Sequence, residues 1–274
     1  MDNDNRLWWM KYKPETLDEV VIDKWLREML EQMINDTASH LLLYGGCGTG
    51  KTSICEVMCK ELNGHKGLNV LKVNASGKNT NDIEFVKDTI EGFVRMAHWG
   101  TKYKIILLDE FDGMSKPAQM SLRKTMESSK NTIFFLTANE IHKVLEAIQS
   151  RCYTRHLTSP PINDFRDRVI YILNKEEVEF DVNVLNKHIN IAYPDFRKCI
   201  NNLQNHSLNN KLMGLCVQDF DGTRIKKYNR LMFLIKQMEY RRDYFNWKLT
   251  YEEKLEFKQL LCNDQFLVSK ELIS

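Results

Sequence analysis

The chain has 274 residues, a length that favours about two domains. Hydrophobic residues make up 43% and charged residues 28%, which fits a globular protein and argues against a disordered or fibrous one. The net charge of +2 excludes a global field that attracts nucleic acid, so any basic DNA-binding face must be local.

The first residues, the apolar runs and the cysteines do not suggest a secreted or membrane protein. The start, Met-Asp-Asn-Asp-Asn, is too polar for a signal peptide, and the apolar runs are far shorter than the ~20 residues that span a bilayer. The seven cysteines lack the spacing of a metal site or a disulfide framework. We expect buried thiols in a reducing compartment, the cytoplasm, or the host cytoplasm if the protein is viral.

The first elements end in a glycine-rich loop. Thr16 and Glu19 have the spacing of a capping box, and a second helix is expected from Asp23. The apolar run 41–44 then reads as a buried strand, because it is short and ends in glycines.

Strands and helices alternate from there to residue 157. This alternation predicts a parallel sheet with helices on both faces. The expected strands are 69–73, 104–108, 132–137 and an edge strand at 153–157, and the expected helices are 83–97, 118–127 and 141–149.

Pro160-Pro161 ends the alternation. Only helices are expected afterwards, at about 163–176, 182–192 and 195–206, with a loop near 207–222. We therefore predict three parts: a nucleotide-binding domain at 1–159, a helical lid at 160–210 and a short helical collar at 211–274.

A phosphate-binding motif, G-x-x-x-x-G-K-[ST], follows the first expected strand. Its glycines let backbone N–H groups point at phosphate oxygens, and the next helix adds the positive end of its dipole. Lys51 would neutralise the β- and γ-phosphates of ATP, and Thr52 would coordinate Mg²⁺. The alternative is a glycine-rich turn without function. The motif consists of Gly45, Gly46, Cys47, Gly48, Thr49, Gly50, Lys51 and Thr52.

Two acidic residues end the strand expected at 104–108. Asp109 is placed to hold Mg²⁺ through water, and Glu110 to orient and deprotonate the attacking water. Strand 69–73 separates the phosphate loop from Asp109 in the sequence, as in the additional-strand class of P-loop proteins. The alternative is a solvated acidic strand end. The sequence therefore favours hydrolysis of ATP in addition to binding.

Three further residues are candidates for catalysis. Asn139 follows a strand expected beside the phosphate-loop strand, where its amide can hold the water or the γ-phosphate, although such residues are usually turn residues. Arg151 could be an arginine finger that enters a neighbour's site, or a surface charge. Arg197 lies in the first turn of a helix that Asp195 caps, where reaching the γ-phosphate and facing solvent are equally compatible with the sequence.

Taken in order, these motifs resemble the AAA+ sliding-clamp loader ATPase subunits of the replication factor C small-subunit type, and most closely the T-even bacteriophage type. The resemblance covers about residues 7–206. It is carried by residues 9–14 with 16–19, 74–76, 109–112, Gln119, Leu122, Arg123, Met126, Glu127, 137–139, 150–152 and 194–198.

The resemblance implies the positions of ligands. Arg151 would act in trans and Arg197 in cis on the nucleotide. Basic residues on inner helices would meet template phosphates, although each could equally be a solvated side chain. The adenine pocket would be lined by Tyr12, Lys13, Pro14, Val20 and Val21, and the DNA would meet Lys78, Lys87 and Arg123.

The resemblance also implies a function: DNA-stimulated hydrolysis of ATP with Mg²⁺, which opens a ring-shaped clamp and places it on primer-template DNA in replication. The partners would be the sliding clamp, the DNA and other loader subunits in a homo- and hetero-oligomeric pentamer, with no membrane. Two alternatives stay open, another AAA+ remodeller such as a helicase loader, and a structural subunit that binds ATP without hydrolysing it.

The sequence departs from the family pattern in three places. The phosphate loop reads Gly-Gly-Cys-Gly where Gly-Pro-Pro-Gly is usual. Asp82 stands where the phage relative carries a basic residue that switches off the carboxylate equivalent to Glu110, unless Lys78 supplies it. Residues 211–274 also leave less room than a family collar takes.

Overall fold

The computed structural model describes residues 7–64, 69–97 and 100–214. The chain forms two compact units. One comprises the described residues up to Glu179 together with Ala192–Leu212, and the other includes Phe180–Ile191. The first unit thus holds the sheet and two of the helices after Pro161. The boundary predicted at 159/160 therefore falls inside the first unit and not between the two units. The predicted collar lies almost entirely outside the described residues.

The first unit is built on a five-stranded parallel sheet, as predicted. The strand order is β2-β3-β4-β1-β5, so the strand that separates β1 from β3 in space is β4, whereas β2 forms one edge. β5 forms the other edge, where the sequence placed it. The strands are β1 Leu41–Tyr44, β2 Val70–Asn74, β3 Lys104–Asp109, β4 Thr132–Ala138 and β5 Tyr153–His156.

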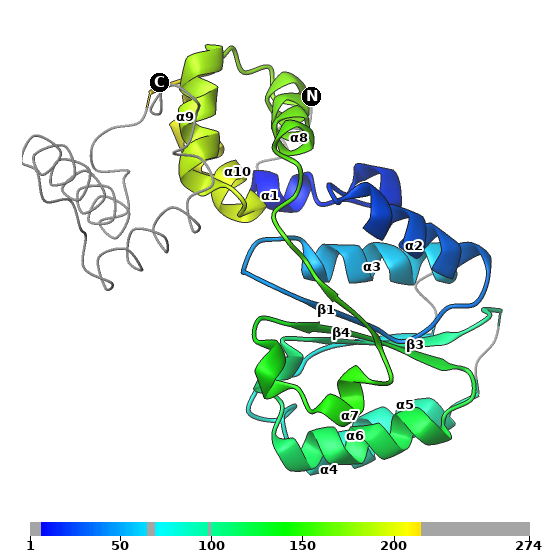
Figure 1. Ribbon diagram of the computed structural model, residues 1–274. Coiled ribbons are helices and arrows are strands. Elements are labelled where there is room, and N and C mark those ends of the chain that lie inside the picture. Colours follow the sequence, from blue (N-terminus) through cyan, green and yellow to red (C-terminus); the bar gives the residue numbers. More distant parts are fainter. Residues whose placement is uncertain (1–6, 65–68, 98–99, 215–274) are drawn as a thin grey trace, which may run out of the picture. The chain divides into compact units, whose positions relative to one another are not determined.

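Helices cover both faces of this sheet (Figure 1). On one face lie α2 (Lys24–Asn35) and α3 (Lys51–Leu62). On the other lie α4 (Ile83–Phe85), α5 (Glu91–Arg95), α6 (Lys116–Ser128) and α7 (Glu146–Gln149). The remaining helices are α1 (Trp8–Lys11), α8 (Ile162–Lys175), α9 (Val182–Ala192) and α10 (Phe196–His206), and a short hairpin joins β6 (Ser207–Leu208) to β7 (Lys211–Leu212).

The alternation of side chains along β1 explains the two layers. Leu41 and Leu43 are buried against α2 and α3, whereas Leu42 between them is buried in the opposite layer with α6. Both faces of a strand are apolar only when both are covered, which is why the short run of leucines predicts a central strand. The apolar layers hold β1 in place, and the loop at its end carries the phosphate motif.

Some expected helices have more complex forms. The helix expected at 83–97 is α4, a π-helical turn at Val86–Ile90 and α5 in succession. Asp82 caps its start by accepting a hydrogen bond from Phe85 N at 2.9 Å. The helix expected at 141–149 is a 3₁₀ turn followed by α7.

The predicted capping box at 16–19 is wrong. Thr16 makes no side-chain cap, and Glu19 instead accepts a hydrogen bond from the backbone of Glu15 at 2.8 Å. Among the described residues, no helix is both long enough and apolar enough to cross a bilayer.

The partly buried position of His40 leads us to expect that the stability of the fold depends on pH. Its Nδ1 lies 3.2 Å from the backbone N of Phe134 on β4, so the ring must be neutral to accept that hydrogen bond. Burial lowers the pKa of His40 below the ordinary value of about 6.5. As pH falls below about 6.5, the unfolded chain takes up this proton before the folded one does, so the stability falls. We expect a loss of about 1 kcal/mol, the worth of one hydrogen bond.

Urea unfolding measured between pH 7.5 and 5 tests this prediction. His40→Asn keeps an acceptor but has no proton to bind, so its stability should depend less on pH than that of the unsubstituted chain. The exposed His142 offers a control, because His142→Asn should keep the full dependence. Identical pH profiles for His40→Asn and the unsubstituted chain would contradict the assignment.

Candidate nucleotide site

The phosphate loop connects β1 to α3, and Lys51 is the first residue of that helix. The Lys51 side chain is buried and turns back into the loop. Its Nζ donates to the carbonyls of Gly45 at 2.9 Å and Gly46 at 2.7 Å. Burial lowers the pKa of Lys51, and neighbouring acidic groups, Asp109 among them, oppose that shift. The loop therefore holds its cation at the place where the motif puts the phosphates.

Oxygen atoms that suit Mg²⁺ meet at the carboxyl ends of β3 and β4. Thr52 Oγ1 donates to Asp109 Oδ1 at 2.7 Å, and Thr137 Oγ1 lies 2.5 Å from the same oxygen. Mg²⁺ in nucleotide sites is usually held by one or two carboxylates and phosphate oxygens. The two residues predicted as metal ligands, Thr52 and Asp109, thus lie in direct contact, and this donor set fits the ion.

Glu110 lies next to this pair in an unusual backbone conformation. Its φ is 52°, in the left-handed region that non-glycine residues seldom adopt. Its exposed carboxylate accepts a hydrogen bond from Asn74 Nδ2 at 3.1 Å, and Ser76 Oγ lies 2.7 Å from the same oxygen. The carboxylate is therefore directed towards the end of the neighbouring strand β2.

Asn74 and Ser76 belong to a motif that the sequence marked, but their contact with Glu110 was not predicted. The register of the sheet brings them there, because Asn74 on β2 is paired with Asp109 on β3. A polar residue at the end of an edge strand, next to an acidic strand end, is the signal that could have found this contact.

Asn139 follows β4, beside the phosphate loop as expected. Its Oδ1 lies 4.0 Å from Cys47 Sγ, and its backbone N donates to Asp112 Oδ1 at 3.2 Å. Asp112, which belongs to the motif at 109–112 but was given no role from the sequence, also accepts from Glu140 N at 3.1 Å. It therefore fixes the turn that carries Asn139.

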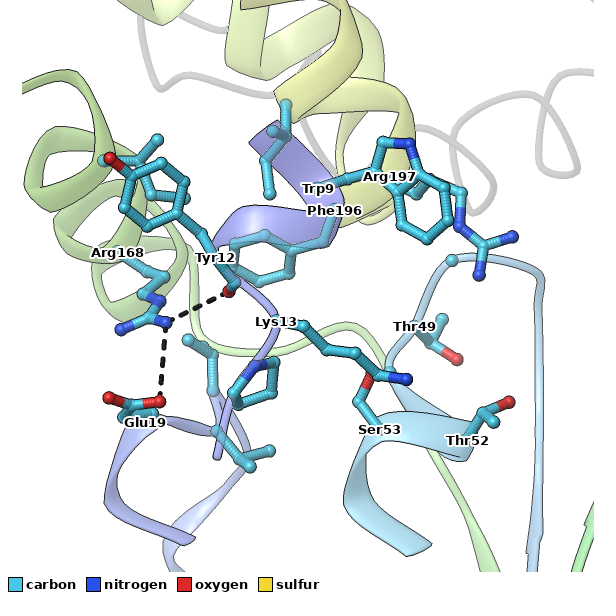
Figure 2. Close-up of a pocket in the computed structure, with 17 residues that line it drawn as sticks. Trp9, Tyr12, Lys13, Glu19, Thr49, Thr52, Ser53, Arg168, Phe196 and Arg197 are labelled. Atoms are coloured by element: carbon cyan, nitrogen blue, oxygen red, sulfur yellow. Dashed lines mark hydrogen bonds and ion pairs between the residues drawn. The ribbon is translucent and has the colours of Figure 1, made fainter. Parts of the chain in front are cut away.

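A pocket opens beside the phosphate loop between the N-terminal segment, α8 and α10 (Figure 2). Thr49, Thr52 and Ser53 lie at one end, and Glu19 and Arg168 at the other. This arrangement gives a phosphate end and a base end. The lining residues are Trp9, Tyr12, Lys13, Pro14, Glu19, Val20, Val21, Gly48, Thr49, Gly50, Thr52, Ser53, Arg168, Ile172, Phe196, Arg197 and Ile200, which include all five residues expected around adenine.

Lys13, one of those five, extends towards the phosphate end of the pocket. Figure 2 shows its side chain directed towards Ser53, at the phosphate end. It forms an ion pair with Glu56 on α3. Burial, followed by the nearby charge of Lys60, lowers its pKa. Lys13 therefore places a cation at the phosphate end of the pocket.

Arg168 on α8 was missed by the sequence analysis. Its Nη2 donates to the carbonyl of Tyr12 at 3.3 Å and lies 3.9 Å from Glu19 Oε2. The arginine therefore joins α8 to the N-terminal segment at the base end of the pocket. Tyr12 is 156 residues away from Arg168 in the chain, so no local sequence pattern marks this contact.

The start of α10 touches the phosphate loop directly. The backbone N of Phe196 donates to the carbonyl of Gly48 at 3.1 Å. Gly48 has a φ of +70°, and a Cβ there would lie 1.9 Å from Asp195 Oδ1. Asp195 caps α10 as predicted, because its Oδ1 accepts from Lys198 N at 2.9 Å. Only glycine allows this close approach.

The two candidate arginines lie in different places. Arg197 is exposed, lines the pocket, and stands over the ring of Trp9 at 5.1 Å. Arg151 follows α7 and does not line the pocket. Its Nη1 donates to the carbonyl of Ala147 at 2.5 Å, and its Nη2 forms an ion pair with Glu127.

The three basic residues expected to meet DNA lie on the layer of α4, α5 and α6. Lys78, before α4, and Lys87, in the π-helical turn, are exposed. Arg123 on α6 is half-buried, with Nε 4.0 Å from Glu127 Oε1. The structure does not bring these residues together with the nucleotide pocket.

The chain is similar to known proteins over most of its length. Residues 41–160 match the model of the ATPase family associated with various cellular activities (AAA). A replication factor C small subunit of Sulfurisphaera tokodaii is 34% identical over 84% of this chain and 71% of its own length. That of Archaeoglobus fulgidus is 37% identical over 72% of this chain. A probable replication factor C subunit 5 of Dictyostelium discoideum is 36% identical over 73% of this chain.

The chain spans 59% of the length of the Dictyostelium relative and 63% of that of the Archaeoglobus relative. Among solved structures, the Thermotoga maritima RuvB Holliday junction branch migration motor matches with a TM-score of 0.57 at 15% identity. That match covers 71% of this chain and 66% of the motor, and it supports the fold. The relatives named here are archaeal and eukaryotic, so the closeness to a bacteriophage subunit stays a prediction.

Proposed function

Because this chain belongs to the replication factor C small-subunit family of AAA ATPases, we propose that it is an ATP-hydrolysing subunit of a sliding-clamp loader. It would open a ring-shaped processivity clamp and place it on primer-template DNA during replication. The observation that carries the proposal is the placement of the cations. Arg197 lines the pocket that opens beside the phosphate loop, and Lys51 is held inside that loop, whereas Arg151 lies outside the pocket, where a neighbouring subunit could meet it.

The roles of the residues follow from this placement. Lys51 binds phosphate, and Thr52 and Asp109 hold Mg²⁺, which supplies charge neutralisation at the phosphates when bound. Glu110 takes the proton of the attacking water, and Asn139 orients that water. The remaining cations neutralise the charge that develops on the phosphoryl group, Arg197 in cis and Arg151 in trans.

Lys78, Lys87 and Arg123 would contact phosphates of the DNA. Such contacts position the protein without reading sequence, and they weaken as salt rises. We further propose a pentamer of like and unlike subunits acting in the cytoplasm, the host cytoplasm if the protein is viral. The parts of this chain would be the nucleotide-binding domain (1–159), the lid (160–210) and the collar (211–274).

Reconstitution tests the function. ATP turnover is measured for this chain with its cognate subunits, alone and with primer-template DNA plus clamp, and native mass gives the subunit count. Turnover should rise when DNA and clamp are present together. No stimulation would refute clamp loading, and stimulation by a replicative helicase in place of the clamp would identify a helicase loader.

A further inference from the structure

Glu127 and Arg151 form an ion pair, and neither residue lines the nucleotide pocket. Glu127 lies in the last turn of α6, and Arg151 follows α7, which packs beside α6. The Arg151 Nη2 meets Glu127 Oε1, and both side chains are about a third to a half exposed. The pair therefore lies at the surface and away from the nucleotide pocket of its own chain.

The position of Glu127 is unfavourable for its own helix. A carboxylate in the last turn faces the negative end of the helix dipole, where cations are preferred. Two arginines offset this charge. Arg123 Nε on the same helix lies 4.0 Å from the oxygen that pairs with Arg151. A surface ion pair contributes little to stability, so fold stability alone gives a weak reason for a carboxylate here.

The contacts of Arg151 leave part of its guanidinium available. Of its five N–H groups, one points at the carbonyl of Ala147 and one at Glu127. Nη1, the nitrogen that donates to Ala147, also lies 3.5 Å from Ser150 Oγ. A long, flexible side chain is thus held at two points, on α7 and on α6, while N–H groups remain to meet an anion.

We propose that Glu127 is a positioning residue for Arg151, holding the guanidinium in the orientation in which it meets the phosphates of the neighbouring subunit. The proposal rests on the function proposed above, because it requires that Arg151 act in trans. Preorganisation of a charge at a reacting phosphoryl group accelerates the chemical step, and misplacement of such a group slows it. Glu127 therefore affects turnover through Arg151, without touching ATP.

Glu127→Gln in the assembled complex tests the proposal. We expect kcat of the DNA- and clamp-stimulated ATPase to fall about tenfold, with KM for ATP and the native mass unchanged. Glu127→Asp keeps the charge and should recover part of the rate. The control is Glu146→Gln, which removes one exposed carboxylate from α7 and should leave the rate unchanged.

The decisive comparison is made in the Arg151→Ala background. A positioning role predicts that Glu127→Gln costs nothing further there, whereas a purely structural role predicts the same loss as before. An unchanged or increased rate for Glu127→Gln alone would overturn the proposal, as would an equal loss in both backgrounds. If Arg151→Ala itself keeps full stimulated turnover, both the trans role and the proposal fail. Absence of stimulation in the unsubstituted complex would instead refute clamp loading itself.

Discussion

Glu110→Gln is expected to abolish most ATP turnover, lowering kcat by about 10²- to 10⁴-fold, while ATP binding persists. The substitution keeps the size of the side chain and an oxygen that can accept from Asn74 and lie near Ser76. It removes the group that takes a proton from the attacking water. Binding depends on Lys51 and the pocket, which the substitution does not touch.

Two measurements separate the effects. Titration with a fluorescent ATP analogue should give the same Kd for Glu110→Gln and the unsubstituted chain, and a phosphate-release assay should show the loss of turnover. Glu140→Gln is the matched control, since that exposed carboxylate pairs with Lys143 and His142 and not with the site. Turnover unchanged in Glu110→Gln would favour the alternative of a structural subunit that binds ATP without hydrolysing it.

Gly48→Ala is expected to weaken ATP binding by tenfold or more, which corresponds to about 1.4 kcal/mol per factor of ten. The new Cβ would lie 1.9 Å from Asp195 Oδ1, and a φ of +70° costs an alanine about 1–2 kcal/mol. To relieve the contact, the start of α10 must move off the loop. Phe196 and Ile200, which line the pocket, would move with it.

A neighbouring glycine provides the control. At Gly46 a Cβ would meet only Thr49 Cγ2 at 3.9 Å, an ordinary contact, so Gly46→Ala should bind ATP nearly as well as the unsubstituted chain. Adding Asp195→Ala to Gly48→Ala removes the three side-chain atoms that the new Cβ would meet, although it also removes the cap of α10, and it should restore part of the affinity. Equal affinities for Gly48→Ala and Gly46→Ala would show that α10 does not close on the loop in solution.

Local sequence was enough to predict the sheet and the phosphate loop. The leucines at 41–43 can only be buried in a strand covered on both faces, and the glycines and Lys51 follow it at once. The π-helical turn at Val86–Ile90, with its extra residue, could not be predicted from the local sequence. A helix with one wider turn keeps nearly the same apolar spacing.

The contacts that define the site were harder to predict, because they join residues far apart in the chain. Asn74 and Glu110 are 36 residues apart, and Arg168 and Tyr12 are 156 apart. Each depends on the register of the sheet or on how the segments near the pocket pack. Hydrophobic periodicity reports which face of an element is buried, but it does not report which side chain another element brings to that face.

The hydrogen bond between Gly48 and Phe196 links the phosphate loop mechanically to α10. Its 11 residues form a rod about 16 Å long at 1.5 Å per residue. One end is fastened to the phosphate loop, and the other runs directly into the β6–β7 hairpin, where Lys211 is bridged to Glu179. A rigid helix moves as one piece. If the phosphate loop shifts when it binds a triphosphate, α10 should therefore shift residues 207–212 with it. This hairpin is therefore where a fluorescent label should report changes at the phosphate loop.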